Sequence, residues 1–314
     1  MLNSQRIFVD AVKRYCADHG IAVEIRSQGW LIVMRRESKT RFTFGYDVGL
    51  NSAMAHRIAN DKSATAEVLA MSGVACIPHT LFLNPRLNVH IAPEGSWEAM
   101  LGLLERSSKG VVVKPNEGTS GRDVILATNR PALELAANRI FSSYPGLAVS
   151  LYVEIEDEIR VILIDDVPAV VYRKDRPAVT GDGTHSLLEL ALAATPPERR
   201  SVVLPGLFAD VDRAELDAVL PPGQRRVLNW RHNLDSGAMP VVLDEGEIKT
   251  ACVQLAVRAA RAIGIRFASI DVVRVDGGWK VLEINSGVMM EALSRRHPDL
   301  VYATYSAALD KVFE

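Results

Sequence analysis

The sequence has few of the features that mark a secreted, membrane-bound or zinc-binding protein. It contains only three cysteines, and Cys16, Cys76 and Cys252 lie far apart, which indicates reduced core thiols rather than disulfides. The seven histidines form no HxxxH or HxH cluster, so a zinc site is not expected. No apolar run approaches the roughly 18–20 residues of a membrane-spanning helix. The N-terminus also lacks the basic start and apolar block of a secretory signal. We therefore expect a cytoplasmic protein without membrane contact.

Strong net charge is also absent. The formal net charge is -2, so we expect no nucleic-acid partner. No GxGxxG follows a predicted strand and no GxxxxGK[ST] occurs, which argues against a dinucleotide-binding oxidoreductase and a P-loop enzyme. The hydrophobic share of 48% is that of an ordinary globular chain, and 314 residues allow one or two domains. A homodimer is the default expectation for the assembly.

The hydrophobic patterning predicts an α+β chain in which helices alternate with hairpins. We expect helices at residues 4–18, 60–73, 94–107, 131–141, 247–263 and 302–313. We expect strands at residues 21–25, 30–34, 77–84, 110–115, 124–127, 149–155, 157–165 and 167–175, and a hairpin over 267–285. Residues 177–238, which contain GDG, TPPERR and LPPG, are expected to form an excursion over a site rather than a separate domain.

The predicted hairpin places acidic residues inside an apolar pattern. With a three-residue turn of Asp276, Gly277 and Gly278, Asp271 lies opposite Glu283, and Asn285 shares their face. Two facing carboxylates repel unless a cation lies between them, and hard oxygen ligands suit magnesium with a bound nucleotide. A two-residue turn would put the carboxylates on opposite faces. The alternative interpretation is a solvated strand face that happens to carry acids.

A second group of residues has features of a phosphate site. Lys114 ends an apolar strand, and the loop NEGTSGRD follows, whose backbone N–H groups can point at phosphate oxygens. Lys62 lies near a helix start, and taken by itself it is interpreted as a surface lysine. In the stretch YVEIEDEIRVIL, Glu158 is placed to accept two ribose hydroxyls, although a charged, exposed hairpin turn explains the same letters.

Taken in order, these segments resemble the ATP-grasp enzymes. The matching segments are NDKSAT, VVVKPNEGTSGRDV, EIEDEIRVIL, VTGDGTHSLLEL, NWRHNLDSGAMP, FASIDVV and VLEINSG, and they span about residues 60–286. The resemblance is to the branch with cyanophycin synthetase and glutathione synthetase. It implies two α+β subdomains whose antiparallel sheets clasp ATP. The chain then divides into a short N-terminal segment (1–59), a first subdomain with the phosphate lid loop (60–150) and a second subdomain with the metal-binding hairpin (151–314).

The same resemblance implies roles for individual residues. Lys62 and Lys114 would contact the nucleotide, under a lid loop that contains Gly118, Ser120 and Gly121. The hinge that meets adenine would consist of Tyr152, Val153, Glu154 and Ile155, with Glu158 on the ribose. Asp271, Glu283 and Asn285 would hold two Mg²⁺ ions, for which Mn²⁺ is a possible substitute. The catalytic candidates that steady the transferred phosphoryl group are Arg231, Asn233 and Arg160.

The activity implied is that of an ATP-dependent carbon–nitrogen ligase. It would join a small carboxylate to an amine, each an amino acid or short peptide, through an acyl phosphate with release of ADP and phosphate. Two alternatives stay open, namely a small-molecule kinase built on the same fold and a nucleotide-binding protein without turnover. The segment before Lys62 is shorter than in related peptide ligases, so the residues that bind the first substrate are not assigned.

Overall fold

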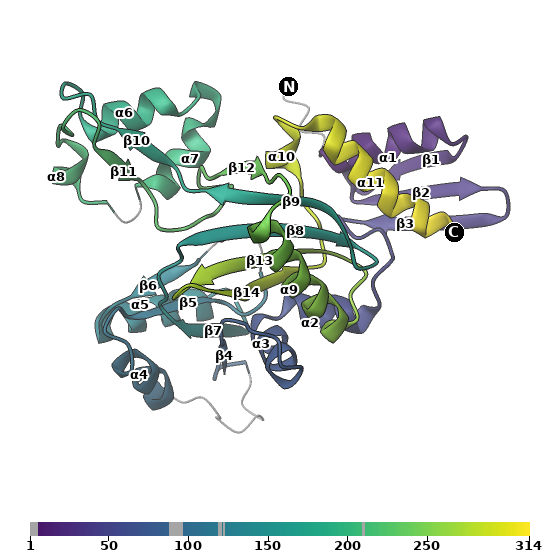
Figure 1. The fold of residues 1–314 in the computed structure, drawn as a ribbon. Coiled ribbons are helices and arrows are strands. Elements are labelled where there is room, and N and C mark those ends of the chain that lie inside the picture. Colours follow the sequence, from purple (N-terminus) through teal and green to yellow (C-terminus); the bar gives the residue numbers. More distant parts are fainter. Residues whose placement is uncertain (1–5, 88–96, 119–120, 122, 209–210) are drawn as a thin grey trace. The chain divides into compact units, whose positions relative to one another are not determined.

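The computed structural model describes residues 6–87, 97–118, 121, 123–208 and 211–314 (Figure 1). The chain forms two compact units, one of Met1–Val171 with Asp244–Glu314 and one of Tyr172–Leu243. Both contain helices and antiparallel sheets, so the predicted α+β class is confirmed. The predicted division into three consecutive segments stays a prediction. Within the described ranges, no helix is long and apolar enough to cross a membrane.

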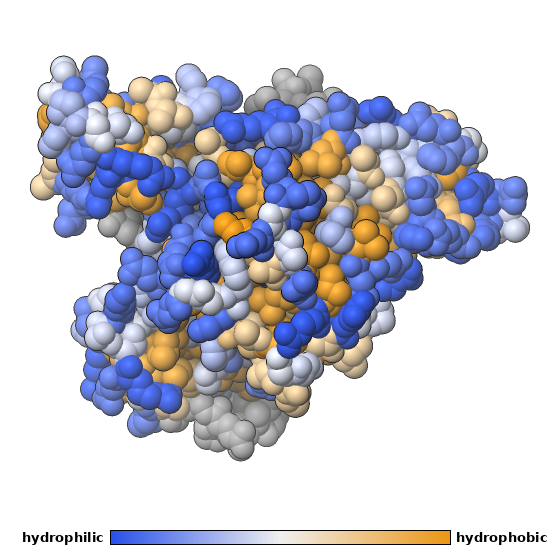
Figure 2. Space-filling model, viewed as in Figure 1, coloured by the Kyte–Doolittle hydropathy of each residue, from blue (hydrophilic) through white to orange (hydrophobic). Residues whose placement is uncertain are grey.

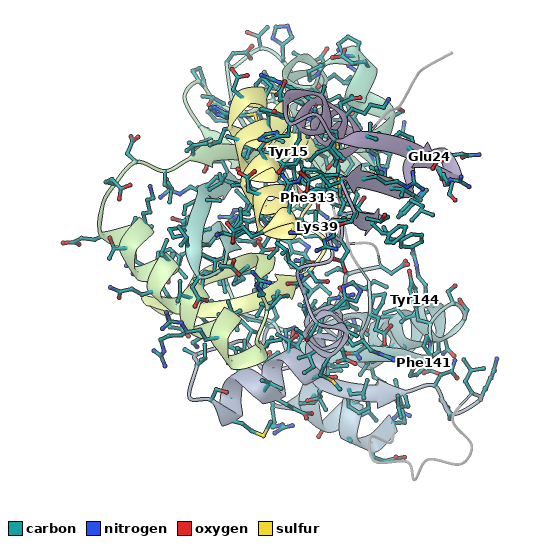
Figure 3. The ribbon with its side chains drawn as sticks, turned by 90° about the vertical axis from the view of Figure 1, so that its right-hand side faces the viewer. Tyr15, Glu24, Lys39, Phe141, Tyr144 and Phe313 are labelled. Carbon is teal, nitrogen blue, oxygen red and sulfur yellow. The ribbon has the colours of Figure 1, made fainter. Side chains whose placement is uncertain are left out.

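The N-terminal part of the first unit is a small antiparallel sheet covered by two helices. Its strands are β1 (Ala22–Arg26), β2 (Leu31–Arg36) and β3 (Lys39–Phe44), in that order. The helices are α1 (Ile7–Asp18) and α11 (Pro298–Phe313), so the first and last helices share one core. The rings of Tyr15 and Phe313 lie 6.4 Å apart in this core (Figure 3). Hydrophilic residues cover the turn that joins β2 and β3 (Figure 2).

A four-stranded antiparallel sheet follows, in the order β4 (Thr80–Leu83), β7 (Gly146–Leu151), β5 (Val111–Pro115) and β6 (Ile125–Ala127). Helices α4 (Trp97–Glu105) and α5 (Arg130–Phe141) pack against it. The strand residues in the core with these helices are Phe82, Val111, Val113, Ala127, Leu147 and Val149. Because side chains alternate along a strand, Lys114 and its neighbours on the adjacent strands lie on the opposite face.

The other large sheet of the first unit contains β9 (Val167–Asp175), β8 (Asp157–Ile164), β13 (Phe267–Val275) and β14 (Gly278–Asn285), in that order. Helix α9 (Glu247–Ile263) lies along β8, β13 and β14 (Figure 1), and it ends at Gly264 in a left-handed conformation, as predicted. Helices α2 (Ala53–Asn60) and α3 (Lys62–Met71) contact α9 and β14. The side-chain oxygen of Asn51 accepts the N–H of Phe267 at 2.9 Å, and its nitrogen donates to the carbonyl of Phe267 at 2.8 Å.

The second unit, Tyr172–Leu243, has its own hydrophobic core. It contains helices α6 (Leu187–Ala194), α7 (Arg200–Leu207) and α8 (Arg213–Leu216), the pair β10 (Ala178–Thr180) and β11 (Arg225–Val227), and β12 (Met239–Val242), which pairs with the end of β9. The buried core residues are Val179, Leu187, Ala191, Val203, Leu207 and Leu228. This stretch is therefore a compact unit and not only an excursion. Its proline and glycine residues interrupt the apolar periodicity from which short amphipathic helices are predicted.

Candidate functional site

In the β13–β14 hairpin, Asp271 and Glu283 pair as predicted, but the turn and the strand register between them differ from the prediction. Val275 pairs with Gly278, so the turn has only two residues, Asp276 and Gly277, both with positive φ (51° and 73°). The prediction of a three-residue turn was wrong. A β-bulge lies between Asp271 and Val272: Val272 pairs with Val281 and Asp271 with Glu283, which leaves Leu282 as the extra residue. The bulge restores the face that the shorter turn would have reversed.

The pairing extends over a third strand and forms a charged row. Arg160 of β8 lies opposite Asp271, and Asp271 lies opposite Glu283. The guanidinium of Arg160 donates two hydrogen bonds of 2.7 Å to the two carboxylate oxygens of Asp271. Asn285, opposite Ser269, continues this face along β14. The positive charge beside Asp271 is therefore supplied in the structure by Arg160.

The oxygen atoms on this face are of the kind that magnesium prefers as ligands. Asp271 and Glu283 offer carboxylate oxygens, Asn285 offers an amide oxygen, and Glu283 and Asn285 are partly exposed. Among the described residues, no three or more His, Cys, Asp or Glu side chains are grouped as a metal site. The predicted set contains only two carboxylates, so its metal role stays a prediction.

Lys114 of the four-stranded sheet is close to one end of this row. Its side chain is buried, and burial lowers the pKa of its ammonium to about 8. The charges of Glu283 and Glu158 act on it in the opposite direction, and that of Lys62 adds to the lowering. Lys114, Glu283, Glu158 and Lys62, which are distant in sequence, are therefore close enough to interact electrostatically.

The start of α3 is tied to the predicted lid loop. Asp61 caps the helix by accepting the N–H of Ala64 at 2.8 Å, and its other oxygen accepts the amide of Asn116 at 2.7 Å. The ammonium of Lys62 donates to the carbonyl of Gly118 at 2.9 Å. Lys62 is buried, so the interpretation as a surface lysine, which its sequence context alone favoured, was wrong. Gly121 has a φ of 65°, and Ser120 lies outside the described residues.

The predicted hinge leaves the sheet after β7. The residues from Tyr152 to Ile155 are not in a strand, although 149–155 was predicted as one strand. The N–H of Tyr152 bonds the carbonyl of Gly110 at 3.0 Å, and Val153 and Ile155 pack against Ile77, Val273 and Val275. Glu154 is exposed and forms an ion pair with Lys109 at 2.9 Å, whereas Glu158 is buried opposite Val273. The adenine and ribose roles of this segment stay predictions.

Arg231 and Asn233 belong to the second unit. The guanidinium of Arg231 lies 4.7 Å from the centre of the Trp230 ring, and the side-chain oxygen of Asn233 accepts the N–H of Asp235 at 2.8 Å. His232 between them is buried, with Nδ1 2.9 Å from the carbonyl of Lys174. The proposed catalytic roles of Arg231 and Asn233 stay predictions.

Two groups of residues at this site were not predicted from the sequence. One is His79, directly before β4, which is buried. Burial and the charges of Lys114 and Lys62 hold the pKa of His79 well below its usual range. The only feature of the sequence that points to His79 is its position two residues before Leu81 in an alternating strand pattern.

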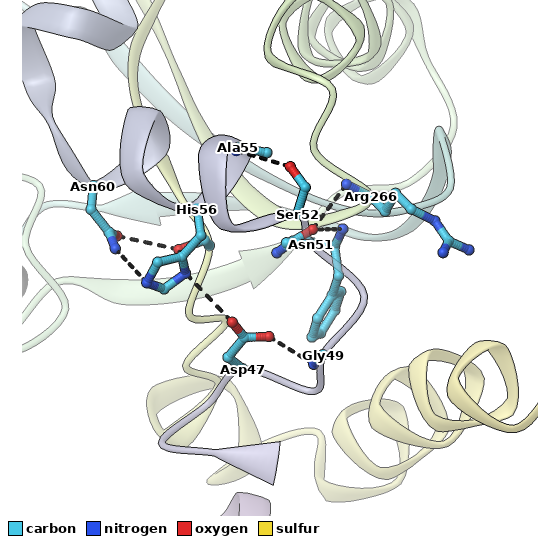
Figure 4. Close-up of polar contacts among 10 residues, drawn as sticks. Asp47, Gly49, Asn51, Ser52, Ala55, His56, Asn60 and Arg266 are labelled. Atoms are coloured by element: carbon cyan, nitrogen blue, oxygen red, sulfur yellow. Dashed lines mark hydrogen bonds and ion pairs between the residues drawn. The ribbon is translucent and has the colours of Figure 1, made fainter. Parts of the chain in front are cut away.

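The second group contacts Ser286, the residue that follows Asn285. The hydroxyl of Ser286 is 2.9 Å from Nδ1 of His56 and 3.2 Å from the side-chain oxygen of Asn60. A carboxylate oxygen of Asp47 lies 3.5 Å from the same Nδ1 (Figure 4). Ser286 is fully buried. Because His56 and Asn60 are four residues apart on α2, a sequence reading could find their shared face but not the partner 226 residues away.

Comparison with known proteins identifies the fold. Residues 217–299 match the model of the RimK-like ATP-grasp domain. In structure, the chain resembles a bifunctional glutathione synthetase from Pasteurella multocida, with a TM-score of 0.56, 18% identity and coverage of 96% of this chain and 44% of the other. It also resembles a D-alanine–D-alanine ligase from Bacillus anthracis, with a TM-score of 0.54, 16% identity and coverage of 84% and 69%. The chain has the ATP-grasp fold, and the predicted resemblance is confirmed.

Curated relatives share part of this sequence. Cyanophycin synthetase from Synechocystis sp. is 29% identical over 198 residues, which are 58% of this chain and 22% of the relative. A probable alpha-L-glutamate ligase from Shewanella pealeana is 25% identical over 183 residues, which are 58% of this chain and 29% of the relative. The matched region thus spans between a fifth and a third of the length of these two relatives.

Proposed function

We propose that this chain, which has the fold of the ATP-grasp proteins, is an ATP-dependent carboxylate–amine ligase that forms an amide bond and releases ADP and phosphate. One observation carries the proposal. The row Arg160, Asp271 and Glu283 lies on one sheet, and buried Lys114 of another sheet lies within electrostatic reach of Glu283. A pair of facing carboxylates lies there between two cations, as is needed to bind a nucleotide triphosphate together with its metal.

The cationic residues have distinct roles in this proposal. Lys62 and Lys114 bind phosphate oxygens of ATP, and their positive charge offsets the repulsion between the triphosphate and an attacking carboxylate. Arg160 holds Asp271 in one orientation through its two hydrogen bonds of 2.7 Å. Asp271, Glu283 and Asn285 would hold magnesium, which when bound neutralises charge on the phosphates. Arg231 and Asn233 of the second unit would steady the phosphoryl group in transfer.

The chemistry explains why ATP is required. A carboxylate does not react with an amine because its leaving group would be oxide. A carboxylate oxygen therefore attacks the γ-phosphorus, ADP leaves, and the product is an acyl phosphate. The amine then attacks the acyl carbon, and inorganic phosphate leaves with the original carboxylate oxygen. Water would hydrolyse the acyl phosphate, so the loop around Gly118 and Gly121 is expected to close over it.

The substrates proposed are amino acids or short peptides. The relatives named as a cyanophycin synthetase and a glutamate ligase, and the structural neighbours named as a glutathione synthetase and a D-alanine ligase, support this class. A homodimer and a cytoplasmic location are part of the same proposal.

The test is nucleotide product analysis with a trapping amine. The purified chain is incubated with magnesium, ATP and pools of amino acids, with and without hydroxylamine. We expect ADP, phosphate and a hydroxamate to form with one pool. Formation of AMP and pyrophosphate would mean adenylation and would contradict the proposal. A stable phosphoester without free phosphate would instead establish the kinase alternative.

A further inference from the structure

Ser286, which directly follows the proposed metal ligand Asn285, belongs to a closed set of hydrogen bonds with two residues of α2. The amide nitrogen of Asn60 is 3.0 Å from Nε2 of His56 (Figure 4). An amide nitrogen only donates, so Nε2 accepts, and the proton of the neutral ring is assigned to Nδ1. Nδ1 then donates to the hydroxyl of Ser286 at 2.9 Å, and this hydroxyl donates to the side-chain oxygen of Asn60 at 3.2 Å.

These residues do not form a hydrolytic centre, although a serine, a histidine and an aspartate come together here. A carboxylate oxygen of Asp47 lies 3.5 Å from Nδ1 of His56, the same nitrogen that Ser286 contacts. In a catalytic triad, the serine and the carboxylate instead bind different nitrogens of the ring. Ser286 is also fully buried, so its hydroxyl is not accessible to a substrate. The set is therefore suited to holding the chain in place.

Residues 47–60 also hold the other strand at the same end of the hairpin. Ser269 of β13 pairs with Asn285 of β14 at the end remote from the turn. The side chain of Asn51 accepts the N–H of Phe267, two residues before Ser269, and donates to the carbonyl of Phe267. The contacts of this segment thus lie within two residues of the Ser269–Asn285 pair on both strands. The backbone position of Asn285 is therefore fixed through both strands of the hairpin.

Asn60 also begins a connection to the phosphate side of the proposed site. Asp61 and Lys62 follow it directly in the chain, as the cap and the first residue of α3. Asp61 accepts the side-chain amide of Asn116 at 2.7 Å, and the ammonium of Lys62 donates to the carbonyl of Gly118 at 2.9 Å. Consecutive Cα atoms are about 3.8 Å apart, so three adjacent residues join the end of β14 to the lid loop.

This connection bears on metal binding because magnesium requires precise ligand positions. It takes near-octahedral geometry with oxygen ligands at about 2.0–2.1 Å. When Asn285 supplies one of these oxygens and the nucleotide phosphates supply others, Asn285 and the phosphate-binding Lys62 must be held at a fixed separation. Residues that orient a ligand without touching the metal can therefore affect metal affinity strongly.

We propose that His56, Asn60 and Ser286 are positioning residues that fix Asn285 relative to Lys62 and the lid loop, so that magnesium strengthens nucleotide binding. The inference rests on the proposed function, because it takes a nucleotide and its metal as the ligands of this site. The three residues act through the backbone of Asn285 and the start of α3. Disruption of the set should therefore reduce the effect of magnesium, whereas Lys62 keeps its own bond to the lid loop and the metal-free affinity changes little.

The experiment measures how much magnesium strengthens the binding of a non-hydrolysable ATP analogue. Titration calorimetry with β,γ-imido-ATP is carried out with excess magnesium and with a chelator, and the ratio of the two dissociation constants is the magnesium effect. His56→Ala removes the donor to Ser286, and because the side chain of His56 is 39% exposed, the fold should tolerate its loss. Ser286→Ala removes the hydroxyl itself.

Two further variants separate positioning from general damage to the fold. In His56→Asn, the side-chain amide lies at the position of Nδ1 and can still donate to Ser286. Thr65→Val is the matched control. The buried hydroxyl of Thr65 donates to the carbonyl of Ile58 in α2 at 2.7 Å, so this variant loses one buried hydroxyl bonded to the same helix and leaves the Ser286 set intact.

We expect the magnesium effect to fall about tenfold in His56→Ala and Ser286→Ala, to be largely restored in His56→Asn and to stay unchanged in Thr65→Val. An unchanged magnesium effect in His56→Ala and Ser286→Ala, with folding checked by thermal unfolding, would overturn the inference. Equal weakening with and without magnesium would also overturn it and make the set a purely structural contact. Failure of the wild-type chain to bind the analogue under either condition would instead contradict the proposed function itself.

Discussion

Arg160 and Asp271 face each other across neighbouring strands, and the guanidinium donates a 2.7 Å hydrogen bond to each carboxylate oxygen. The side chain of Asp271 is 5% exposed and that of Arg160 16%. Removal of Arg160 takes two charge-assisted hydrogen bonds from a buried carboxylate. We therefore predict that Arg160→Ala lowers the free energy of unfolding by about 3–5 kcal/mol, measured by urea denaturation.

A surface ion pair provides the control for this prediction. Arg139 and Asp123 are 2.9 Å apart, but the side chain of Arg139 is 70% exposed. Arg139→Ala should therefore cost less than about 1 kcal/mol. If Arg160→Ala were no more destabilising than Arg139→Ala, the Arg160–Asp271 pair would not be the buried contact described above.

Glu283 is the residue on which activity should depend most. Glu283→Gln keeps the shape of the side chain but removes the negative charge beside Lys114 and the proposed metal. We predict a loss of turnover by orders of magnitude with an unchanged thermal unfolding midpoint, assayed as ADP release. Glu134→Gln, on the exposed surface of α5, is the matched control and should be fully active. Near-normal turnover in folded Glu283→Gln would remove Glu283 from the site.

The lowered pKa of Lys114 predicts a pH dependence of ATP binding. Burial lowers the pKa from 10.5 to about 8, so in the free chain the ammonium loses its proton as the pH rises through about 8. Phosphate binding needs the charged form and favours it. The affinity for ATP should therefore be greatest below pH 8 and fall by up to about tenfold per pH unit above it.

A substitution that cannot lose its charge tests this cause. Lys114→Arg stays protonated throughout the range, so its affinity, even if lower overall, should not change with pH. Calorimetry from pH 7 to about pH 10 measures both proteins. A parallel decline in Lys114→Arg would attribute the effect to another group.

Two glycines, one in the hairpin turn and one inside a helix, should respond in opposite ways to replacement by alanine. Gly277 has a φ of 73°, so alanine there is strained even though no atom lies within 4 Å of the added carbon. We expect Gly277→Ala to cost about 1–2 kcal/mol. Gly102 lies inside α4 with equally open space and no positive φ, so Gly102→Ala should stabilise the chain by about 0.5–1 kcal/mol. Thermal unfolding of both variants checks the contrast, and destabilisation by both would contradict it.

The sequence predicted those parts of the fold that local patterns determine. Helix α9 was expected at residues 247–263 and is found there, because a regular apolar stripe and a terminal glycine mark both its face and its end. The pairing of Asp271 with Glu283 was also predicted, although the assumed turn was wrong. The prediction missed both the shorter turn and the bulge at Leu282, and the effects of these two features on the pairing cancel. No local sequence pattern predicts the bulge.

The remainder of the site depends on contacts between distant segments. Nothing in the sequence around Arg160 shows that it pairs with Asp271, 111 residues away. His79 lies in an ordinary strand pattern. Only the structure, in which β4 pairs with β7, shows that its Nε2 is buried and has no hydrogen-bond partner among the described residues. The core of Tyr172–Leu243 is likewise assembled from short helices separated by proline-rich turns, which read singly as loops.

The most direct test of the central claim follows one oxygen atom. The carboxylate substrate identified by the hydroxamate screen is labelled with oxygen-18, and the inorganic phosphate released during turnover is analysed by mass spectrometry. The acyl-phosphate mechanism predicts that each phosphate carries one labelled oxygen from the carboxylate. Unlabelled phosphate would mean that ATP is hydrolysed by water without activating the carboxylate, and label found in AMP would mean adenylation; either result would contradict the account.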